Sequence, residues 1–380
     1  MRYSRLIADM LRRYIKTRYF EQMKKKKGRS AKDSHSNLEI SIGKIFQEMN
    51  REHGPIFVPT EENPDQVEPF FPVSLLSTIH QTVERMIGSK VPGFKIEREM
   101  QKNNGELVCK ATELSLYFRT ASYGRKTHPA NFQPSELINL FFEIAKKDEF
   151  LDEEFRNKNF PSRQSGKIVA EIYNEMVEQI RRSASTREFK QKLQKRVRAS
   201  IKNFNSAVTY VTELFTLHKK LLVVRLNCYL PSLSDEAAMI KQAKDCLRKL
   251  SNNKRNNLLF ADVAGFLWKL EYHHKHGYYF HFIFFYSDDC DESSVDLTHQ
   301  IGQYWVTPLT KGGGGYRNCE ESSNEFLSSC IGIVDRADSV SRNKLRQAFY
   351  YLTMKDQYLR FGAGDAGKRF GRGGVTGGEW

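Results

Sequence analysis

The sequence predicts an α+β protein in which a mostly helical N-terminal half precedes a C-terminal domain built on an antiparallel sheet. Up to about residue 215, apolar residues recur at the spacing of amphipathic helices. From about residue 216, runs of β-branched and aromatic residues alternate with helical segments. Two of those runs, 264–274 and 277–286, are so close in sequence that they must form an antiparallel hairpin. Helices are expected to pack on one face of the sheet.

The N-terminal half is expected to contain five helices and two irregular segments. Residues 1–23 show helical periodicity, and the basic run KKKKGRSAK that follows them is expected to be a solvated linker. Residues 54–74 hold five prolines, which favour an irregular connection. The other helices are expected near 75–90, 135–150 and 167–182 and from 183 onward.

The helix that begins near residue 183 is strongly basic. Ser185 and Glu188 form a capping-box pattern at its start. Its positive side chains make it the best candidate for contact with nucleic-acid phosphates. An exposed helix with an uneven charge distribution is the alternative. The candidate contacts are Arg187, Lys190, Lys195, Arg198 and Lys202.

The C-terminal domain is expected to follow the order strand, helix, strand, strand, helix, strand, helix. Its strands are 221–230, 264–274, 277–286 and 330–336, and its helices are 231–250, 294–309 and 339–359. Ser232 or Ser234 is expected to cap the first of these helices. The predicted domains are thus a mostly helical basic region, 1–215, and a sheet domain, 216–375. The tail 361–380 is too rich in glycine to predict a regular element.

The net charge of +15 favours a polyanionic partner, most simply nucleic acid, with a membrane surface as the weaker alternative. The six cysteines form no CxxC pair, which argues against a zinc ribbon or a disulfide framework. The N-terminus does not have the pattern of a signal peptide, and no stretch is apolar enough to span a bilayer. These features predict a soluble, cytoplasmic protein without a membrane partner.

His281 lies in the middle of the apolar strand 277–286. Because side chains alternate along a strand, Tyr279 and His281 share one face. Glu271 lies on the partner strand of the hairpin, shortly before the turn. A carboxylate and an imidazole on neighbouring strands can converge on one divalent cation. The alternative is a core histidine that is hydrogen-bonded to a neighbour.

The last helix places Tyr351 and Lys355 four residues apart, and therefore on one helical face. A tyrosine that attacks a phosphodiester needs a nearby cation to stabilise the developing negative charge, and a metal can polarise the phosphate. Lys355 could supply the cation and the hairpin could supply the metal site. The alternative is that Tyr351 is a core or interface aromatic residue.

Residues from about 216 to 373 resemble a known family. The sequence words that carry the resemblance are LLVVRLN, FLWKLEY, GYYFHFIFFY, IGQYWVTPLTKGGGGYRNC, YYLTMKDQY and KRFGRGG, in that order. They are similar to the C-terminal domain of YagK/YfjJ and to inovirus gene-two-type replication proteins. This family looks like a branch of the HUH endonucleases, which nick single-stranded DNA at replication origins. The resemblance implies an HUH-like, RRM-like palm domain.

The resemblance also implies roles for individual residues. Tyr351 would be the nucleophile that becomes joined to a 5′-phosphate, and Lys355 would be its helper cation. His281 would bind Mg²⁺ or Mn²⁺, with Glu271 as a possible further ligand. The family's first metal-binding histidine is replaced here by Tyr279, and a phenol near neutral pH is a poor ligand for a hard cation. The family's lysine also stands one residue earlier, at Met354.

The sequence therefore supports two main hypotheses. The first is a phage- or satellite-type replication-initiation protein that nicks and rejoins origin DNA, binding single-stranded DNA and host replication proteins. The second is a non-catalytic module, with a degenerate HUH site, that binds nucleic acid or a host protein in regulation or defence. Under either hypothesis, basic residues around the glycine run and in the tail are expected to contact DNA. These residues are Lys311, Arg317, Lys368 and Arg369.

Overall fold

The structure is a computed structural model. It describes residues 40–53, 56–59, 67–70, 73–98, 107–125, 132–146, 157–159, 166–231, 233, 235–253, 257–273, 276–287, 290, 292–319, 330–362 and 367–373. The helix expected over 1–23, the basic run after it, and the caps expected at Ser232 or Ser234 lie outside these residues. The chain divides into two compact units. Unit 1 contains Leu75–His128 and Pro134–Lys195, and unit 2 contains Ile40–Ser74, Pro129–Gln133 and Arg196–Trp380.

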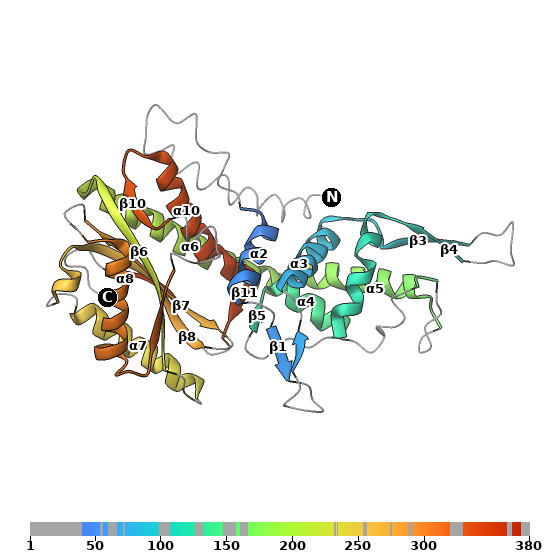
Figure 1. The fold of residues 1–380 in the computed structure, drawn as a ribbon. Helices are drawn as coiled ribbons and strands as arrows, with labels where there is room; N and C mark the ends of the chain where they lie inside the picture. Colours follow the sequence, from blue (N-terminus) through green and yellow to red (C-terminus); the bar gives the residue numbers. More distant parts are fainter. Residues whose placement is uncertain are drawn as a thin grey trace. The chain divides into compact units, whose positions relative to one another are not determined.

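Unit 1 is built mainly from helices, as the sequence predicts (Figure 1). Its helices are α3 (Val73–Gly88), α4 (Glu136–Ala145), α5 (Val169–Ser185), the start of α6 (Arg187–Leu217) and the 3-10 helix η1 (Glu113–Arg125). Strands β3 (Phe94–Arg98) and β4 (Leu107–Ala111) form an antiparallel pair beside them. Tyr173 anchors the core: its ring packs edge-on against Phe94 and Phe118, and its hydroxyl donates to the Leu114 carbonyl at 2.8 Å.

The start of α6 differs from the predicted capping box. Ser185 is the last residue of α5, and its hydroxyl donates to the Arg182 carbonyl. The cap is the next residue, Thr186, whose hydroxyl oxygen accepts from the Phe189 N–H at 3.3 Å. The chain turns at Thr186 because its backbone is extended there, with ψ near 149°. The predicted helix is therefore confirmed, with its start moved by one residue.

Unit 2 is built on an antiparallel sheet. Its strands run in the order β10–β6–β8–β7–β12, and β9 pairs with the same edge of β6 as β10 does. These strands are β6 (Lys220–Tyr229), β7 (Val263–His273), β8 (Gly277–Tyr286), β9 (Gly315–Asn318), β10 (Gly332–Asp335) and β12 (Phe370–Gly373). The hairpin β7–β8 forms as predicted, with Lys269 opposite His281 and Glu271 opposite Tyr279. The chain is thus an α+β protein with antiparallel sheets.

The remaining elements of unit 2 are helices and short strand pairs. The helices are α2 (Ile42–His53), the rest of α6, α7 (Glu236–Asn253), η4 (Leu258–Phe260), α8 (Ser294–Tyr304), the π-helix η5 (Trp305–Leu309), α10 (Ser339–Met354) and η6 (Lys355–Gln357). The pairs are β1 (Ile56–Pro59) with β2 (Val67–Phe70), and β5 (Phe132–Pro134) with β11 (Leu359–Phe361). Among the described residues, no helix combines the length and apolar character needed to cross a bilayer.

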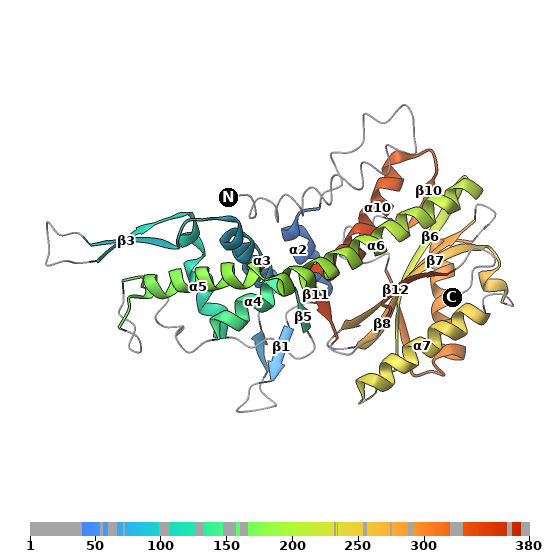
Figure 2. The same cartoon turned by 180° about the vertical axis from the view of Figure 1, so that it is seen from behind.

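Helices cover both faces of the sheet, which corrects the expectation of one covered face (Figure 2). Even-numbered residues of β8, such as Phe280 and Phe282, pack with α7 and α8 in the main apolar core. Odd-numbered residues point the other way, and Phe285 meets Phe349 of α10. Nine successive residues of β8 are buried because both faces are covered. This explains why that strand lacks the polar alternation of a half-exposed strand.

The glycine-rich C-terminal segment, 361–380, contains the short strand β12, so the expectation of no regular element there is wrong. β12 extends the sheet, with Gly371 opposite Trp268 and Gly373 opposite Phe266. A Cβ atom at Gly373 would lie 1.8 Å from the Phe266 ring, and one at Gly371 would lie 2.6 Å from the Trp268 ring. The glycines are therefore compatible with a strand because large aromatic side chains occupy the space beside them.

Candidate functional site

The residues predicted as site residues on the hairpin and on the last helix converge on one face of the sheet in unit 2. It is the face formed by the odd-numbered residues of β8. β7 contributes Lys269 and Glu271, which lie two residues apart and therefore share a face. β8 contributes Tyr279 and His281, directly across from them. The Tyr279 hydroxyl donates to Glu271 Oε2 at 2.9 Å. Tyr279 therefore acts here as a hydrogen-bond donor to the carboxylate.

The end of α10 brings Tyr351 and Lys355 to the same place. Lys355 Nζ lies 5.0 Å from the centroid of the Tyr351 ring, as expected for neighbours on one helical face. The same ammonium group contacts Glu271 Oε1 at 2.8 Å and Glu52 Oε2 at 2.9 Å. The Tyr351 hydroxyl donates to Glu52 Oε2 at 2.7 Å. One oxygen of Glu52 thus accepts from both the tyrosine and the lysine.

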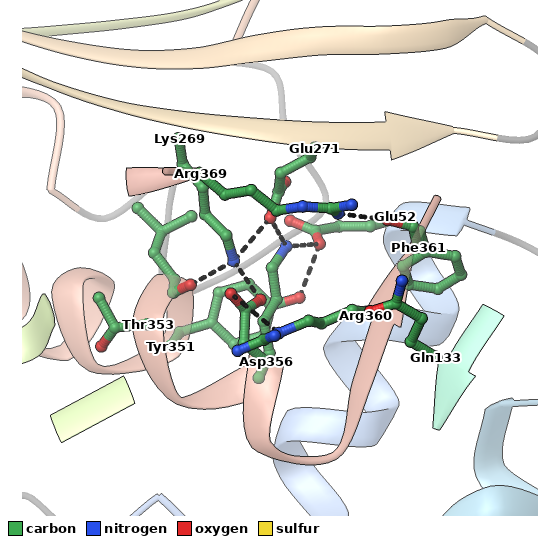
Figure 3. A network of polar contacts seen from close by, with 12 residues as sticks. Glu52, Gln133, Lys269, Glu271, Tyr351, Thr353, Asp356, Arg360, Phe361 and Arg369 are labelled. Carbon is green, nitrogen blue, oxygen red and sulfur yellow. Dashed lines mark hydrogen bonds and ion pairs between the residues drawn. The ribbon is translucent and has the colours of Figure 1, made fainter. Parts of the chain in front are cut away.

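A second lysine completes the network, which Figure 3 shows from close by. Lys269 Nζ contacts Glu271 Oε1 at 2.9 Å and Asp356 Oδ1 at 2.7 Å, and it also donates to the Leu352 carbonyl. Lys269 and Lys355 therefore share Glu271 between them. Two ammonium groups and three carboxylates alternate along the network, so that each buried charge has a partner of opposite sign.

Burial and charge together shift the ionisation of these groups. Burial raises the pKa of Glu271, but Lys269 and Lys355 together hold that pKa well below its ordinary value. Burial lowers the pKa of Lys355, and Glu271 and Glu52 outweigh it, so that the pKa of Lys355 is raised. Burial and the Glu52 carboxylate raise the pKa of Tyr351 well above its ordinary value. At neutral pH the site therefore contains a neutral phenol among paired ions.

His281 is held by an arginine from the neighbouring strand. Arg225 of β6 donates from Nε to His281 Nε2 at 2.5 Å, and both side chains are buried. Burial and the positive charge of Arg225 lower the pKa of His281 well below its ordinary value. The imidazole is therefore neutral, and the lone pair of its Nε2 is directed at the guanidinium group.

The predicted metal ligands do not fit a divalent cation in this arrangement. His281 offers its Nε2 lone pair to Arg225, and Glu271 offers its oxygens to two ammonium groups and a phenol. A metal would have to displace these donors and accept three buried cations beside it. Across the described residues, no three His, Cys, Asp or Glu side chains are grouped so that they could hold a metal ion. The sequence-based expectation of Mg²⁺ or Mn²⁺ stays a prediction, and no step below uses a metal.

The basic residues proposed for nucleic-acid contact are mostly at the surface. On α6, Lys190 is partly exposed, and the others are exposed: Arg187, Lys195, Arg198 and Lys202. In unit 2, Lys311, Arg317 and Lys368 are exposed. Arg369 turns inward instead and donates to the carbonyls of Phe361 and Gly362. Arg196, in the same basic helix, is also buried, and its guanidinium group donates to the carbonyls of Asp356 and Gln133.

A pocket in unit 2 opens beside the charged network. Its lining includes four cationic side chains and two carboxylates: Lys269, Lys355, Arg360, Arg369, Glu271 and Asp356. The cationic groups outnumber the anionic ones, so the pocket favours an anion over a cation. Lys355, which lines this pocket, also binds Glu52, the hydrogen-bond partner of Tyr351.

Sequence reasoning missed Glu52, Lys269, Asp356 and Arg225. Lys269 and Arg225 each interrupt an apolar strand with a charge, and that signal could have drawn attention to them. Glu52 gives no such signal, because it lies in an ordinary amphipathic helix about 300 residues from its partners. No family model, curated protein or solved structure matches this chain.

The buried His281 predicts a loss of stability in mild acid. Its ordinary pKa is 6.5 and its pKa in the folded protein is well below that, so below pH 6.5 the unfolded chain binds a proton that the folded chain does not. From about pH 7.5 to about pH 5.5, this difference lowers the free energy of unfolding by an amount on the order of 1 kcal/mol. Glu271 titrates below this window, because its pKa is lowered from 4.5.

The measurement is urea denaturation at the two pH values for the wild type and for His281→Gln, whose side-chain oxygen can still accept from Arg225. The variant should lose less stability on acidification, by about the amount that His281 contributes. Equal losses in the two proteins would contradict the assignment of a neutral His281.

Proposed function

We propose that unit 2 is an HUH-like, RRM-like palm domain that nicks and rejoins single-stranded DNA through Tyr351, as in replication initiation of phages or their satellites. One observation carries this proposal: the Tyr351 hydroxyl donates to Glu52, and Lys355 binds the same carboxylate oxygen. A nucleophile within hydrogen-bond distance of a base, with the base oriented by a third group, is the arrangement that activates weak nucleophiles. The resemblance of residues 216 to 373 to the YagK/YfjJ-type domain supports the same reaction class.

In the proposed step, Tyr351 Oη attacks the phosphorus of a phosphodiester, and its proton passes to Glu52. The bond between phosphorus and the 3′ oxygen breaks, and the 3′ oxygen leaves and takes a proton from solvent. A phosphotyrosine bond to the 5′-phosphate remains. The 3′-hydroxyl can reverse the step, which rejoins the strand. Lys355 stabilises the negative charge that develops on the phosphate oxygens.

Access to Tyr351 requires the network to open, because its side chain is fully buried. The cationic pocket beside Lys269 and Lys355 is the route that a phosphate would take. Incoming phosphate oxygens would compete with Glu52 and Glu271 for the lysine ammonium groups. The exposed residues Lys311, Arg317 and Lys368 would hold the DNA backbone, and basic residues of α6 would add further contacts.

The test is a covalent adduct assay with single-stranded oligonucleotides that cover the DNA around the protein's own coding sequence. Wild-type protein should give a protein–DNA band on a denaturing gel. Tyr351→Phe should abolish the band, and Glu52→Gln should slow its formation by about 10²- to 10⁴-fold. The matched control is Tyr350→Phe, because Tyr350 lies beside Tyr351 on α10 but its ring packs against Phe204 of α6. A Tyr351→Phe protein that still forms the band would overturn the proposed nucleophile.

A second candidate is a nucleic-acid-binding module that does not cut. The closed state of the network favours this candidate, because Tyr351, Lys355 and Glu271 are all buried. The Tyr351 hydroxyl is hydrogen-bonded to Glu52, and Lys355 is paired with Glu271. This candidate expects binding to single-stranded DNA with no adduct from any oligonucleotide. Binding that is lost in a Lys311→Gln/Arg317→Gln/Lys368→Gln variant, with no band in wild type, would favour this candidate over the nuclease.

A further inference from the structure

Arg225 is a buried cation in the middle of an apolar strand. Its side chain is 2% exposed, and its neighbours in β6 are Val224 and Leu226. Burial of a cation is costly unless partners compensate its charge. Its Nε donates to His281, but its Nη1 has no hydrogen-bond partner among the residues that the structure describes. An unpaired buried donor of this kind calls for an explanation beyond packing.

Arg225 shares its face of the sheet with two other buried cations. Arg225 contacts His281, which lies opposite Lys269 in the pairing of β7 with β8. Lys355 is paired with Glu271, which lies on the same face of the sheet. Three cations, Arg225, Lys269 and Lys355, thus lie on one face of the sheet, and each is no more than 3% exposed. The carboxylates of Glu271 and Glu52 are already paired with the two lysines. The guanidinium group of Arg225 is left with a neutral partner.

We infer that Arg225 is a resident cation that replaces a divalent metal at this site, and that its Nη1 group binds an oxyanion such as a nonbridging phosphate oxygen. The guanidinium group provides a fixed positive charge and planar N–H donors, which suit a phosphate. It also takes the Nε2 lone pair of His281 and repels any metal ion nearby. The oxyanion part of this inference rests on the proposed function, and the exclusion of metal does not.

Arg225 also determines whether a histidine at position 279 could bind a metal. Restoring a histidine there would recreate two imidazoles on one face of β8, but Arg225 would still occupy the lone pair of His281. Tyr279→His alone should therefore fail to create a metal site. Tyr279→His combined with Arg225→Met should bind Mn²⁺ more tightly, because the second change frees the lone pair of His281 and leaves two imidazoles on one face. Lys269 and Lys355 remain beside Glu271 in every variant, so they do not account for the difference.

The experiment measures Mn²⁺ binding to the full chain by isothermal titration calorimetry and by the loss of the free Mn²⁺ signal in electron paramagnetic resonance. Four proteins are compared: wild type, Tyr279→His, Tyr279→His/Arg225→Met and the control Tyr279→His/Arg317→Met. Arg317 is the matched control because it is an exposed arginine on the strand that pairs with β6. The Arg225 double variant should bind Mn²⁺ at least about 100-fold more tightly than the other three.

The Mn²⁺ titration does not depend on DNA cleavage. Mn²⁺ binding to wild type or to Tyr279→His that is lost in His281→Ala would overturn the inference. This comparison remains valid if the Arg225 variant does not fold, because it uses proteins that retain Arg225. If the adduct of the proposed function forms, it should form equally well in EDTA, and a strict requirement for Mn²⁺ would also overturn the inference. If no adduct forms at all, the proposed function fails while the Mn²⁺ titration still decides whether Arg225 excludes the metal.

Discussion

Replacement of Lys355 by methionine is expected to lower the free energy of unfolding of unit 2 by about 3–5 kcal/mol. The side chain is 3% exposed and its ammonium group binds two carboxylates, Glu52 and Glu271. Methionine has a similar volume, so the cost comes from charge and not from a cavity. The carboxylates lose a cation that compensates their burial. Urea denaturation followed by tryptophan fluorescence reports on this unit, because Trp268 and Trp305 lie in its core.

Two companion variants separate the charge effect from other causes. Lys344→Met changes an exposed lysine on the same helix and should alter stability by no more than about 0.5 kcal/mol. Lys355→Met combined with Glu271→Gln removes a negative charge along with the positive one, and should recover part of the loss. If the single and double variants are equally destabilised, the shared ion pair is not the source of the effect.

Replacement of Phe282 by alanine is expected to lower the free energy of unfolding by about 3–5 kcal/mol, through loss of packing and not of charge. Phe282 is fully buried at the centre of β8, on the face opposite to the charged network. Its ring contacts Phe266, Phe280, Phe284 and Trp305, with centroid separations of 5.2–6.2 Å. Alanine would leave a cavity that these rings, held by the sheet and by η5, can fill only in part. Chemical denaturation measures the loss.

The control for this change is Leu258→Ala, because Leu258 is 91% exposed. That variant should stay within about 0.5 kcal/mol of wild type. A loss at Phe282 no larger than the loss at Leu258 would mean that the two covering helices close over the missing ring. In that case the aromatic cluster would not be the rigid support that positions β8 for the site.

The elements of unit 2 could be predicted well because their signals are local. The strand around His281 is apolar and aromatic over ten residues, and a three-residue connection fixes its partner. Alternation then places Tyr279 and His281 on one face, and helical spacing places Tyr351 beside Lys355. Each of these inferences needs only residues that are close in sequence, and the structure contains all of these elements.

The rest of the site depends on contacts that no local pattern encodes. Glu52 reaches Tyr351 from α2, and Arg225 reaches His281 from another strand. The position of Arg225 decides whether His281 can serve a metal, yet the sequence shows only one charge within an apolar run. The strand β12 was missed for a related reason: its glycines disfavour a strand on propensity, and the facing rings of Trp268 and Phe266 override that preference.

The link between Glu52 and the end of α10 has a consequence for how the protein matures. Glu52 is separated in the chain by 299 residues from Tyr351 and by 303 residues from Lys355. Contacts of such high sequence separation form slowly, because the intervening chain must first be ordered. During synthesis α2 emerges early, whereas Tyr351 and Lys355 emerge only after the strands β6, β7 and β8. The charged network can therefore close only when translation is nearly complete. A ribosome-bound chain carries β6, β7, β8, β9 and β10 before it carries the tyrosine, and the edge strand β12 follows the tyrosine.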